Sequence, residues 1–250
     1  FGTESQKAEL LPKIAEGDLI ATTALIASDE VTVKENRISG SFNFVSFGLE
    51  ADILLVATAS GIFIIKRSEP GVSIEPRETT TGYSQAALTM INVNAQQLGT
   101  VSYENFTIWL SLRIDSAICS IMAGACEASL NLASEYTKIR QQFDRAIATF
   151  QAVSQRAGDA YIDTEAVRLT SRQAAWRISA GLPAAEQVAI ARWWASEAGF
   201  RVVHAATHLH GGVGVDRDYP LHRYFLMARQ LELTMGNSEE QLEELGNLLA

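Results

Sequence analysis

Apolar and polar residues follow different periods along the chain, and each period predicts a different kind of element. Residues 3–16 carry three apolar side chains on one side, which is typical of a short helix, and Gly17 follows as a helix-ending residue. From residue 19 to residue 101 the apolar runs are short and rich in β-branched residues, as at 52–58 and 61–66. Turn residues separate these runs, so the stretch predicts a small antiparallel sheet, closed as a barrel or stacked as a sandwich.

A helical period returns near Ser102 and continues to the end of the chain. The first long helix keeps its apolar positions roughly on one face, at Ile108, Leu112, Cys119, Met122, Cys126 and Leu130. The later helices are expected at residues 150–180, 184–210 and 219–250. Four such helices bury their apolar faces by packing as a bundle. The predicted fold class is therefore α+β multidomain, with a β-domain at 19–101 followed by a C-terminal four-helix bundle at 102–250.

The bulk composition narrows the classes of protein to which the chain can belong. The chain has 250 residues, 47% of them hydrophobic, which is enough for more than one small core. Its net charge of −9 argues against nucleic-acid binding, which normally needs a basic face. No unbroken run of about 18 apolar residues is present, so we expect no membrane span. The first residues lack the basic and apolar segments of a signal peptide, so we expect a cytoplasmic location.

Two cysteines and three clustered histidines raise the questions of a disulfide and of a metal site. Cys119 and Cys126 are seven residues apart in a predicted helix, a rise of about 10 Å, which is too long for a disulfide. We expect both to be buried thiols. His204 and His208 share a helix face, but His210 lies off that face and no further ligand is close in the sequence. The sequence therefore predicts no metal site.

The most specific chemistry lies in two short segments of the helical half. The residues concerned are Arg140, Gln142, Phe143, Phe150, Gln151, His208, Gly211 and Gly212. A guanidinium such as that of Arg140 can meet a pyrophosphate through paired, charge-assisted hydrogen bonds. Adjacent glycines let the backbone approach phosphate oxygens without a side chain in the way. Together the two segments offer groups that a phosphate-bearing ligand can use.

Each of these residues also has an ordinary structural explanation. Arg140 fits a solvated charge at a helix end, where the helix dipole favours a cation. Phe143 and Phe150 fit an apolar core, and the glycine pair at 211 and 212 fits a helix C-cap. The order and spacing of the whole set favour the cofactor interpretation over these separate explanations.

In order and spacing the set resembles the two dinucleotide-binding motifs of the acyl-CoA dehydrogenase family. The likeness is greatest to the non-catalytic subunit of bacterial α2β2 acyl-CoA dehydrogenases that degrade steroid side chains. Asp144 stands where the family has Gly, which is a feature of that subgroup, and His208 stands where the family has Gln. The resemblance implies that Arg140 and its companions contact FAD bound by a neighbouring subunit. It also implies that residues 1–18 are the end of an N-terminal helical domain missing from this chain.

The resemblance further implies that the catalytic base is missing. The family uses a Glu to remove a proton from the carbon next to a thioester carbonyl. The two positions at which the family carries this Glu correspond to Met235 and Ile114, and neither side chain can accept a proton. Asp115 is adjacent to Ile114, but neighbouring helix residues point about 100° apart. We therefore expect Asp115 to be an ordinary helix carboxylate and the chain to have no catalytic residue.

The part of the β-domain that corresponds to the family's flavin pocket is also altered. The family segment that stacks a Trp on the flavin corresponds to residues 42–48, where Phe44, Ser46 and Phe47 replace the usual residues. Ile26 replaces a Thr that contacts the flavin in the family. The sequence thus predicts that this chain's own flavin pocket is lost while its contacts to a neighbour's FAD are kept.

Three hypotheses follow from the sequence. In the first, the chain completes the FAD site of a catalytic partner subunit in an α2β2 enzyme that dehydrogenates an acyl-CoA, in this subgroup a steroid side-chain CoA. Electrons would then pass to an electron-transfer flavoprotein. In the second, the chain is an autonomous homo-oligomeric acyl-CoA dehydrogenase that uses Asp115. In the third, it is a structural subunit without flavin contact. No partner of nucleic-acid or membrane type is expected.

Overall fold

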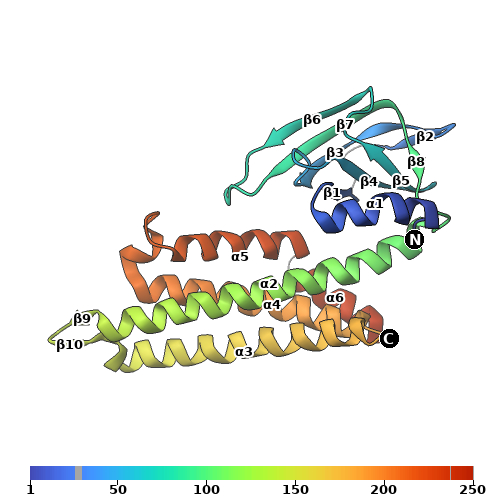
Figure 1. The fold of residues 1–250 in the computed structure, drawn as a ribbon. Helices are drawn as coiled ribbons and strands as arrows, with labels where there is room; N and C mark the ends of the chain where they lie inside the picture. The colour runs from blue at the N-terminus through green and yellow to red at the C-terminus, as the bar shows by residue number, and fades with distance from the viewer. Residues whose placement is uncertain (26–29, 237, 250) are drawn as a thin grey trace. The chain divides into compact units, whose positions relative to one another are not determined.

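The computed structural model describes residues 1–25, 30–236 and 238–249. The chain forms two compact units, Phe1–Leu110 and Ser111–Ala250, and the division falls within the long helix α2 (Tyr103–Ile139). The first unit contains α1, the strands β1 to β8 and the start of α2, and the second contains the rest of α2 and the helices α3 to α6 (Figure 1).

The first unit begins with α1 (Glu4–Glu16), as the pattern of residues 3–16 predicts. Thr3 caps its N-terminus: its hydroxyl accepts from the Gln6 backbone N–H, while the Gln6 side chain accepts from the Thr3 backbone N–H. Gly17 ends the helix in the left-handed conformation, with φ 81°.

Two four-stranded sheets with a shared core make up the rest of the first unit, in the orders β1-β4-β5-β8 and β2-β3-β7-β6. The strands are β1 (Ala21–Ala24), β2 (Thr32–Lys34), β3 (Arg37–Ser46), β4 (Ile53–Thr58), β5 (Gly61–Lys66), β6 (Val72–Arg77), β7 (Gln85–Asn94) and β8 (Gln96–Gln97). The core contains side chains of both sheets, among them Phe42 and Leu54. Of the two predicted forms, the sandwich is therefore the one observed, and the described strands do not close into a barrel.

The prediction of a purely antiparallel β-domain is wrong in one pair, because β1 pairs with β4 in parallel, with Ala21 opposite Ile53. The unbroken apolar runs at 52–58 and 61–66 correspond to β4 and β5, which are buried along most of their length. Burial on both faces favours continuous apolar runs over alternation. The sequence pattern therefore identified the strands but not the direction in which β1 pairs.

The second unit is a helical bundle in which α2, α3 (Gln151–Ser179), α4 (Ala185–His210) and α5 (Leu221–Met235) run alongside one another (Figure 1). The helix predicted at 219–250 is interrupted: Gly236, with φ 87°, follows α5, and α6 (Ser238–Leu249) is a separate helix. A tight connection with β9 (Gln141–Gln142), β10 (Arg145–Ala146) and the 3-10 helix η1 (Ile147–Thr149) joins α2 to α3. A second 3-10 helix, η2 (Gly211–Val215), follows α4.

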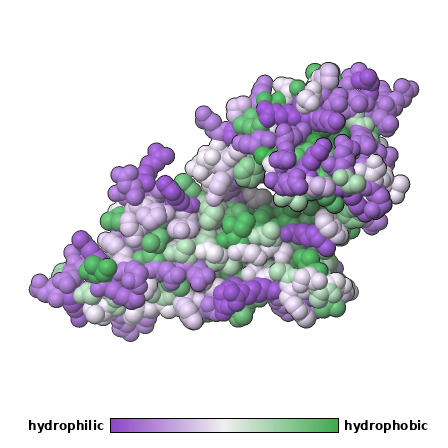
Figure 2. All heavy atoms as spheres, in the orientation of Figure 1, coloured by the Kyte–Doolittle hydropathy of each residue, from purple (hydrophilic) through white to green (hydrophobic). Residues whose placement is uncertain are grey.

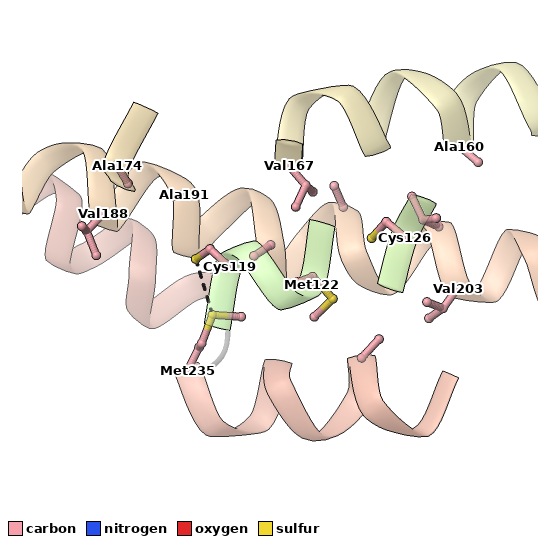
Figure 3. Close-up of a cluster of buried hydrophobic side chains, with 14 of the residues drawn as sticks. Cys119, Met122, Cys126, Ala160, Val167, Ala174, Val188, Ala191, Val203 and Met235 are labelled. Atoms are coloured by element: carbon pink, nitrogen blue, oxygen red, sulfur yellow. Dashed lines mark hydrogen bonds between the residues drawn. The ribbon is translucent and has the colours of Figure 1, made fainter. Parts of the chain in front are cut away.

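The bundle core is filled mainly by small and sulfur-containing side chains. Met122, Cys119 and Cys126 of α2 are fully buried and face valines and alanines of α3 and α4 (Figure 3). Both cysteines are free and buried, as predicted, and burial raises the pKa of each thiol to about 12.

Helix α2 is also long and apolar enough to cross a membrane, judged by length and composition alone. The expectation of no membrane span rested on the absence of an unbroken apolar run, which Arg113 and Asp115 interrupt. A core helix of a bundle has the same composition, and α2 supplies Cys119, Met122 and Cys126 to the core. One helix of this kind is therefore weak evidence for a membrane span.

Candidate functional site

A groove of about 640 Å³ lies at the end of the bundle that carries β9 and β10. Its walls come from the end of α2, from β9 and η1, and from the junction of α4 with η2. The lining residues are Tyr136, Arg140, Gln142, Ile147, His208, Leu209, His210, Gly211, Gly212, Val213 and Asp216. Five of the eight predicted site residues are among them, although the sequence separates them into two segments about 60 residues apart.

Arg140 is placed in this groove by the way α2 ends. Its backbone N–H donates to the carbonyl of Tyr136 at 2.9 Å, and its own carbonyl accepts from the N–H of Ile147 at 2.8 Å, which closes the connection to α3. The side chain is exposed, and no carboxylate of the described residues lies within ion-pair distance of it. A solvated helix-end charge and an anion ligand both fit this geometry, and the guanidinium is available to an anion.

The connection between β9 and β10 explains why Asp144 can stand in place of Gly. Phe143 and Asp144 both adopt left-handed backbone conformations, with φ 54° and 61°. Two consecutive residues of this kind form the tight turn that joins an antiparallel strand pair. Asp tolerates the left-handed region better than most residues other than Gly. The Asp is thus compatible with the turn.

The structural requirement for glycine differs among the glycines at the other wall of the groove. Gly211 caps α4 with φ 62°, so the predicted C-cap explanation holds for it. Gly214 allows close packing, because a Cβ there would lie 2.6 Å from the Thr207 carbonyl oxygen. Gly212 has neither reason: its φ is not positive, and a Cβ would meet nothing within 4 Å. The space left by the missing side chain is therefore available to a ligand in the groove.

His208 and His210 have opposite environments. His208 is exposed and lines the groove, as predicted for a hydrogen-bond donor. His210 is buried: its Nδ1 lies 2.8 Å from the Ala206 carbonyl and its Nε2 lies 3.1 Å from the Tyr219 hydroxyl. Its ring stacks on Tyr136 with centroids 4.5 Å apart. Tyr136 was not predicted as part of the groove, because an aromatic residue at helical spacing is normally part of the core.

The three remaining predicted residues lie beside the groove and do not line it. Phe143 is 87% exposed, so its explanation as a core residue is wrong. Its ring meets Phe150 edge-on with centroids 6.1 Å apart, and the Arg145 guanidinium lies 4.1 Å from the Phe150 ring centroid. Gln151 begins α3 and is exposed. Figure 2 shows hydrophobic residues among hydrophilic ones at this end of the bundle.

The residues around the predicted positions of the family's catalytic base lie away from the lining of this groove. Met235 ends α5 inside the bundle core, 3% exposed, with its sulfur 3.9 Å from the Cys119 sulfur (Figure 3). Asp115 is mostly buried, and its carboxylate lies 3.5 Å from Arg192 Nε. Burial raises the pKa of the Asp115 carboxyl, and Arg192 opposes this shift. Arg192 also donates to the Met235 carbonyl at 2.7 Å and pairs with Glu244 at 2.6 Å.

The residues at which the sequence predicts a lost flavin pocket lie in the first unit. Phe44 and Phe47 have φ 55° and 54° and are more than half exposed. The Ser46 hydroxyl accepts from the Gln85 side chain at 2.9 Å. Ile26 lies outside the described residues. Among the described residues, no group of three or more potential ligands could hold a metal ion.

The lining of the groove fits the phosphate part of a dinucleotide. An unpaired guanidinium, an exposed imidazole and a glycine without a steric reason lie there, and the side-chain amide of Gln142 offers a further hydrogen bond. Asp216 is the one carboxylate among the lining residues, and it accepts from the Asp218 backbone N–H at 3.0 Å. The arrangement can bind an anion, but it contains no carboxylate positioned as a base.

Comparisons with known proteins give a consistent picture. Residues 116–249 match the family described as acyl-CoA dehydrogenase, C-terminal domain. The chain is 39% identical to acyl-CoA dehydrogenase FadE27 of Mycobacterium tuberculosis, over 86% of this chain and 61% of that protein. It is 28% identical to acyl-CoA dehydrogenase FadE28 of the same organism, over 84% of this chain and 62% of that protein. The chain thus spans about three fifths of the length of these relatives.

Two solved structures are similar in both sequence and fold. The ChsE4–ChsE5 complex from Mycobacterium tuberculosis superimposes with a TM-score of 0.91 at 36% identity, covering 100% of this chain and 71% of that chain. A variant of the Tcur3481–Tcur3483 steroid ACAD gives a TM-score of 0.88 at 33% identity, covering 99% and 71%. Both are assemblies of two different proteins by name.

Proposed function

Because the chain belongs to the acyl-CoA dehydrogenase family, whose members bind FAD, we propose that it is a subunit of an FAD-dependent acyl-CoA dehydrogenase. In this proposal it completes the FAD site of a partner subunit and does not itself perform the chemistry. The partner carries the catalytic Glu, and the assembly is an α2β2 heterotetramer in the cytoplasm. The reaction is the α,β-dehydrogenation of an acyl-CoA thioester.

The observation that carries this proposal is the groove at the end of the bundle. Arg140 presents a free guanidinium there, opposite the glycine wall at 211 and 212. Bound FAD supplies the hydride acceptor for such a reaction. In this chain Arg140 would pair with its pyrophosphate, His208 and Gln142 would offer hydrogen bonds, and Gly212 would leave room for close backbone approach. In this proposal a partner subunit covers the open groove and encloses the cofactor.

The absence of a suitable base supports the assignment of the chemistry to the partner. Removing a proton next to a thioester carbonyl needs a carboxylate that the substrate can reach. Met235 is buried and cannot accept a proton, Ile114 is aliphatic, and the Asp115 carboxylate faces Arg192. At the predicted base positions, the side chains therefore cannot accept a proton, and the neighbouring Asp115 carboxylate is already paired with Arg192.

The substrate class and the partners are proposed from the named relatives. The Tcur3481–Tcur3483 assembly is a steroid ACAD, and ChsE4–ChsE5 is a complex of two proteins. By analogy we assign a steroid side-chain CoA thioester as substrate, a catalytic acyl-CoA dehydrogenase subunit as partner, and an electron-transfer flavoprotein as electron acceptor.

One observation favours a second candidate, the autonomous homo-oligomeric enzyme. The pKa of Asp115 is raised by burial, and raised carboxyl pKa values are a property of catalytic bases. If Asp115 were the base, Asp115→Asn would abolish turnover by a homo-oligomer of this chain. In the proposed heteromer the same variant keeps the turnover of the complex.

The test is to co-express the chain with a candidate catalytic subunit and measure FAD per heterodimer by absorbance. One FAD per pair, with none on this chain alone, supports the split site. Two FAD per pair, or FAD and turnover on this chain alone, would overturn the proposal in favour of the autonomous enzyme.

A variant separates the split site from a purely structural role. Arg140→Ala is expected to weaken FAD binding by the complex by about 1.5–3 kcal/mol, the value of a lost charge-assisted hydrogen bond. Arg156→Ala, which removes an exposed Arg from α3, is the matched control and is expected to leave FAD affinity unchanged. Equal FAD affinity for both variants would favour a structural subunit without flavin contact.

A further inference from the structure

His210 is a buried polar side chain between the two walls of the groove. It ends α4, is 3% exposed, and lies between Tyr136 of α2 and the start of the glycine wall at Gly211. Burying an imidazole costs free energy unless its nitrogens are hydrogen-bonded. Both nitrogens of His210 have a partner: Nδ1 has the Ala206 carbonyl at 2.8 Å, and Nε2 has the Tyr219 hydroxyl at 3.1 Å. The ring is therefore fully satisfied in one orientation.

The two partners fix the direction of each hydrogen bond. A carbonyl oxygen can only accept, so Nδ1 of His210 carries a proton and donates it to the Ala206 carbonyl. In the neutral ring Nε2 then has a free lone pair, and the Tyr219 hydroxyl donates to it. An apolar side chain of similar size would fill the same space but would make neither bond. Packing alone therefore does not require a histidine here.

The glycine wall needs to be held from outside because its own sequence leaves it free. The 3-10 helix η2 has glycine at three of its five positions, and glycine loses more conformational freedom on folding than any other residue. The hydrogen bond between His210 and Tyr219 joins the residue just before η2 to a residue four positions after it. A Cβ at Gly214 would lie 3.1 Å from the His210 Cβ, so η2 packs directly on this side chain. The histidine thus fixes both ends of the glycine segment.

The His210 ring also contacts the wall that carries Arg140. Tyr136 stacks on it with ring centroids 4.5 Å apart and an angle of 25° between the ring planes. The Tyr136 carbonyl accepts from the Arg140 backbone N–H at 2.9 Å. One side chain therefore links the glycine segment to the helix end that presents the guanidinium.

We propose that His210 is a positioning residue that holds the glycine wall in place against the Arg140 wall, through its hydrogen bond with Tyr219 and its stack on Tyr136. The inference rests on the proposed function, because the ligand between the walls is the phosphate part of FAD. Both nitrogens of His210 are already engaged, so it acts on the ligand through its neighbours and not by a hydrogen bond of its own. Holding the walls before the ligand arrives lowers the entropic cost of binding.

The FAD affinity of the complex with the catalytic subunit tests the two hydrogen bonds separately. His210→Asn puts an amide nitrogen near the place of Nδ1 but leaves no acceptor for the Tyr219 hydroxyl, whereas His210→Gln puts its amide near Nε2 and can accept from that hydroxyl. Tyr219→Phe removes the hydroxyl alone. We expect His210→Asn and Tyr219→Phe each to weaken FAD binding about fivefold to tenfold, which corresponds to one lost hydrogen bond. His210→Gln is expected to stay within about twofold of the unsubstituted complex. The double variant is expected to bind no more weakly than either single one, because both substitutions remove the same bond.

Hydrogen exchange of the full chain without partner or FAD tests the positioning directly. The amides of residues 211–215 are expected to exchange faster in His210→Asn and Tyr219→Phe, because η2 has lost its hold, and to exchange at the original rate in His210→Gln. Tyr224→Phe is the matched control: it removes a hydroxyl from a half-buried tyrosine of α5 that does not line the groove. We expect it to change neither the exchange nor the FAD affinity.

Four results would overturn the inference. In the first, His210→Gln binds FAD as weakly as His210→Asn, so the hydrogen bond with Tyr219 has no part in the effect. In the second, the amides of η2 exchange equally fast in all four variants. In the third, His210→Asn and Tyr219→Phe match Tyr224→Phe in FAD affinity while Arg140→Ala weakens it, so the proposed function stands and the positioning role fails. In the fourth, Arg140→Ala also leaves the FAD affinity unchanged, and the flavin proposal fails together with this inference.

Discussion

Met235→Glu introduces a carboxylate at the position that we predict for the base of the acyl-CoA dehydrogenase family, and we expect a destabilised chain without turnover of its own. Met235 is 3% exposed, and its sulfur lies 3.9 Å from that of Cys119. The guanidinium of Arg192, which binds the Met235 carbonyl, is already engaged by Asp115 and Glu244. The new carboxylate therefore enters the apolar core of the bundle.

The size of the effect follows from the cost of charging a buried carboxyl. Burial of this degree raises a Glu pKa by about 3 units or more from its ordinary value near 4.3. Because the folded pKa is then above the unfolded one, the destabilisation is absent below the unfolded pKa and grows as the pH rises towards the folded pKa. For a rise of about 3 units, the cost is about 1 kcal/mol at pH 5 and about 4 kcal/mol at pH 8.

The assay is urea unfolding of Met235→Glu and Met235→Gln at pH 5 and pH 8. The Gln side chain has nearly the same shape and cannot ionise, so the difference between the two variants isolates the charge. We expect the Glu variant to lose about 3 kcal/mol relative to the Gln variant between these pH values. Equal pH dependence of the two variants would show that the site is solvated and refute the reasoning, as would turnover by Met235→Glu alone.

Three further predictions test other parts of the second unit. Gly214→Ala is expected to lower the melting temperature, because its Cβ would lie 2.6 Å from a carbonyl oxygen. Gly212→Ala is expected to keep the melting temperature and to weaken FAD binding by the complex, because a Cβ there meets nothing within the chain. Arg192→Met is expected to destabilise the chain by about 3–5 kcal/mol in urea unfolding, because it leaves a buried carboxylate without its partner. Cys119 and Cys126, with thiol pKa values of about 12, are expected to resist iodoacetamide at pH 8 in the folded chain and to react after denaturation; modification at the native rate of an exposed thiol would contradict this.

The periodic part of the fold was accessible from the sequence. Long amphipathic segments predicted the helices that became α2, α3 and α4, and Gly17 marked the end of α1, because period and capping are local properties. The break at Gly236 was missed, since one Gly in a long helical pattern is often tolerated. The parallel pairing of β1 with β4 was missed because strand direction depends on contacts between distant segments.

The candidate site was accessible only in part. The sequence identified Arg140 and the glycines from their chemistry and spacing, and the family resemblance is confirmed by the match of residues 116–249. It could not show that Phe143 is exposed or that Tyr136 lines the groove, because these facts depend on how the end of α2 turns into β9. The assignment of the eight residues to FAD binding stays a prediction, as do the domain boundaries at 18 and 101.

The separation of the groove from the base position explains how one could be kept and the other lost. Helix α5 leads from η2 at the groove to Met235, a distance of about 22 Å for its 15 residues. Sites this far apart without shared contacts respond almost independently to substitution. In the proposed heteromer, an apolar core with Met235 beside Cys119 can therefore occupy the predicted base position without disturbing Arg140 or the glycine wall. In that proposal, selection on the partner's cofactor acts on the groove alone, so the groove is kept in a chain that leaves the base to its partner.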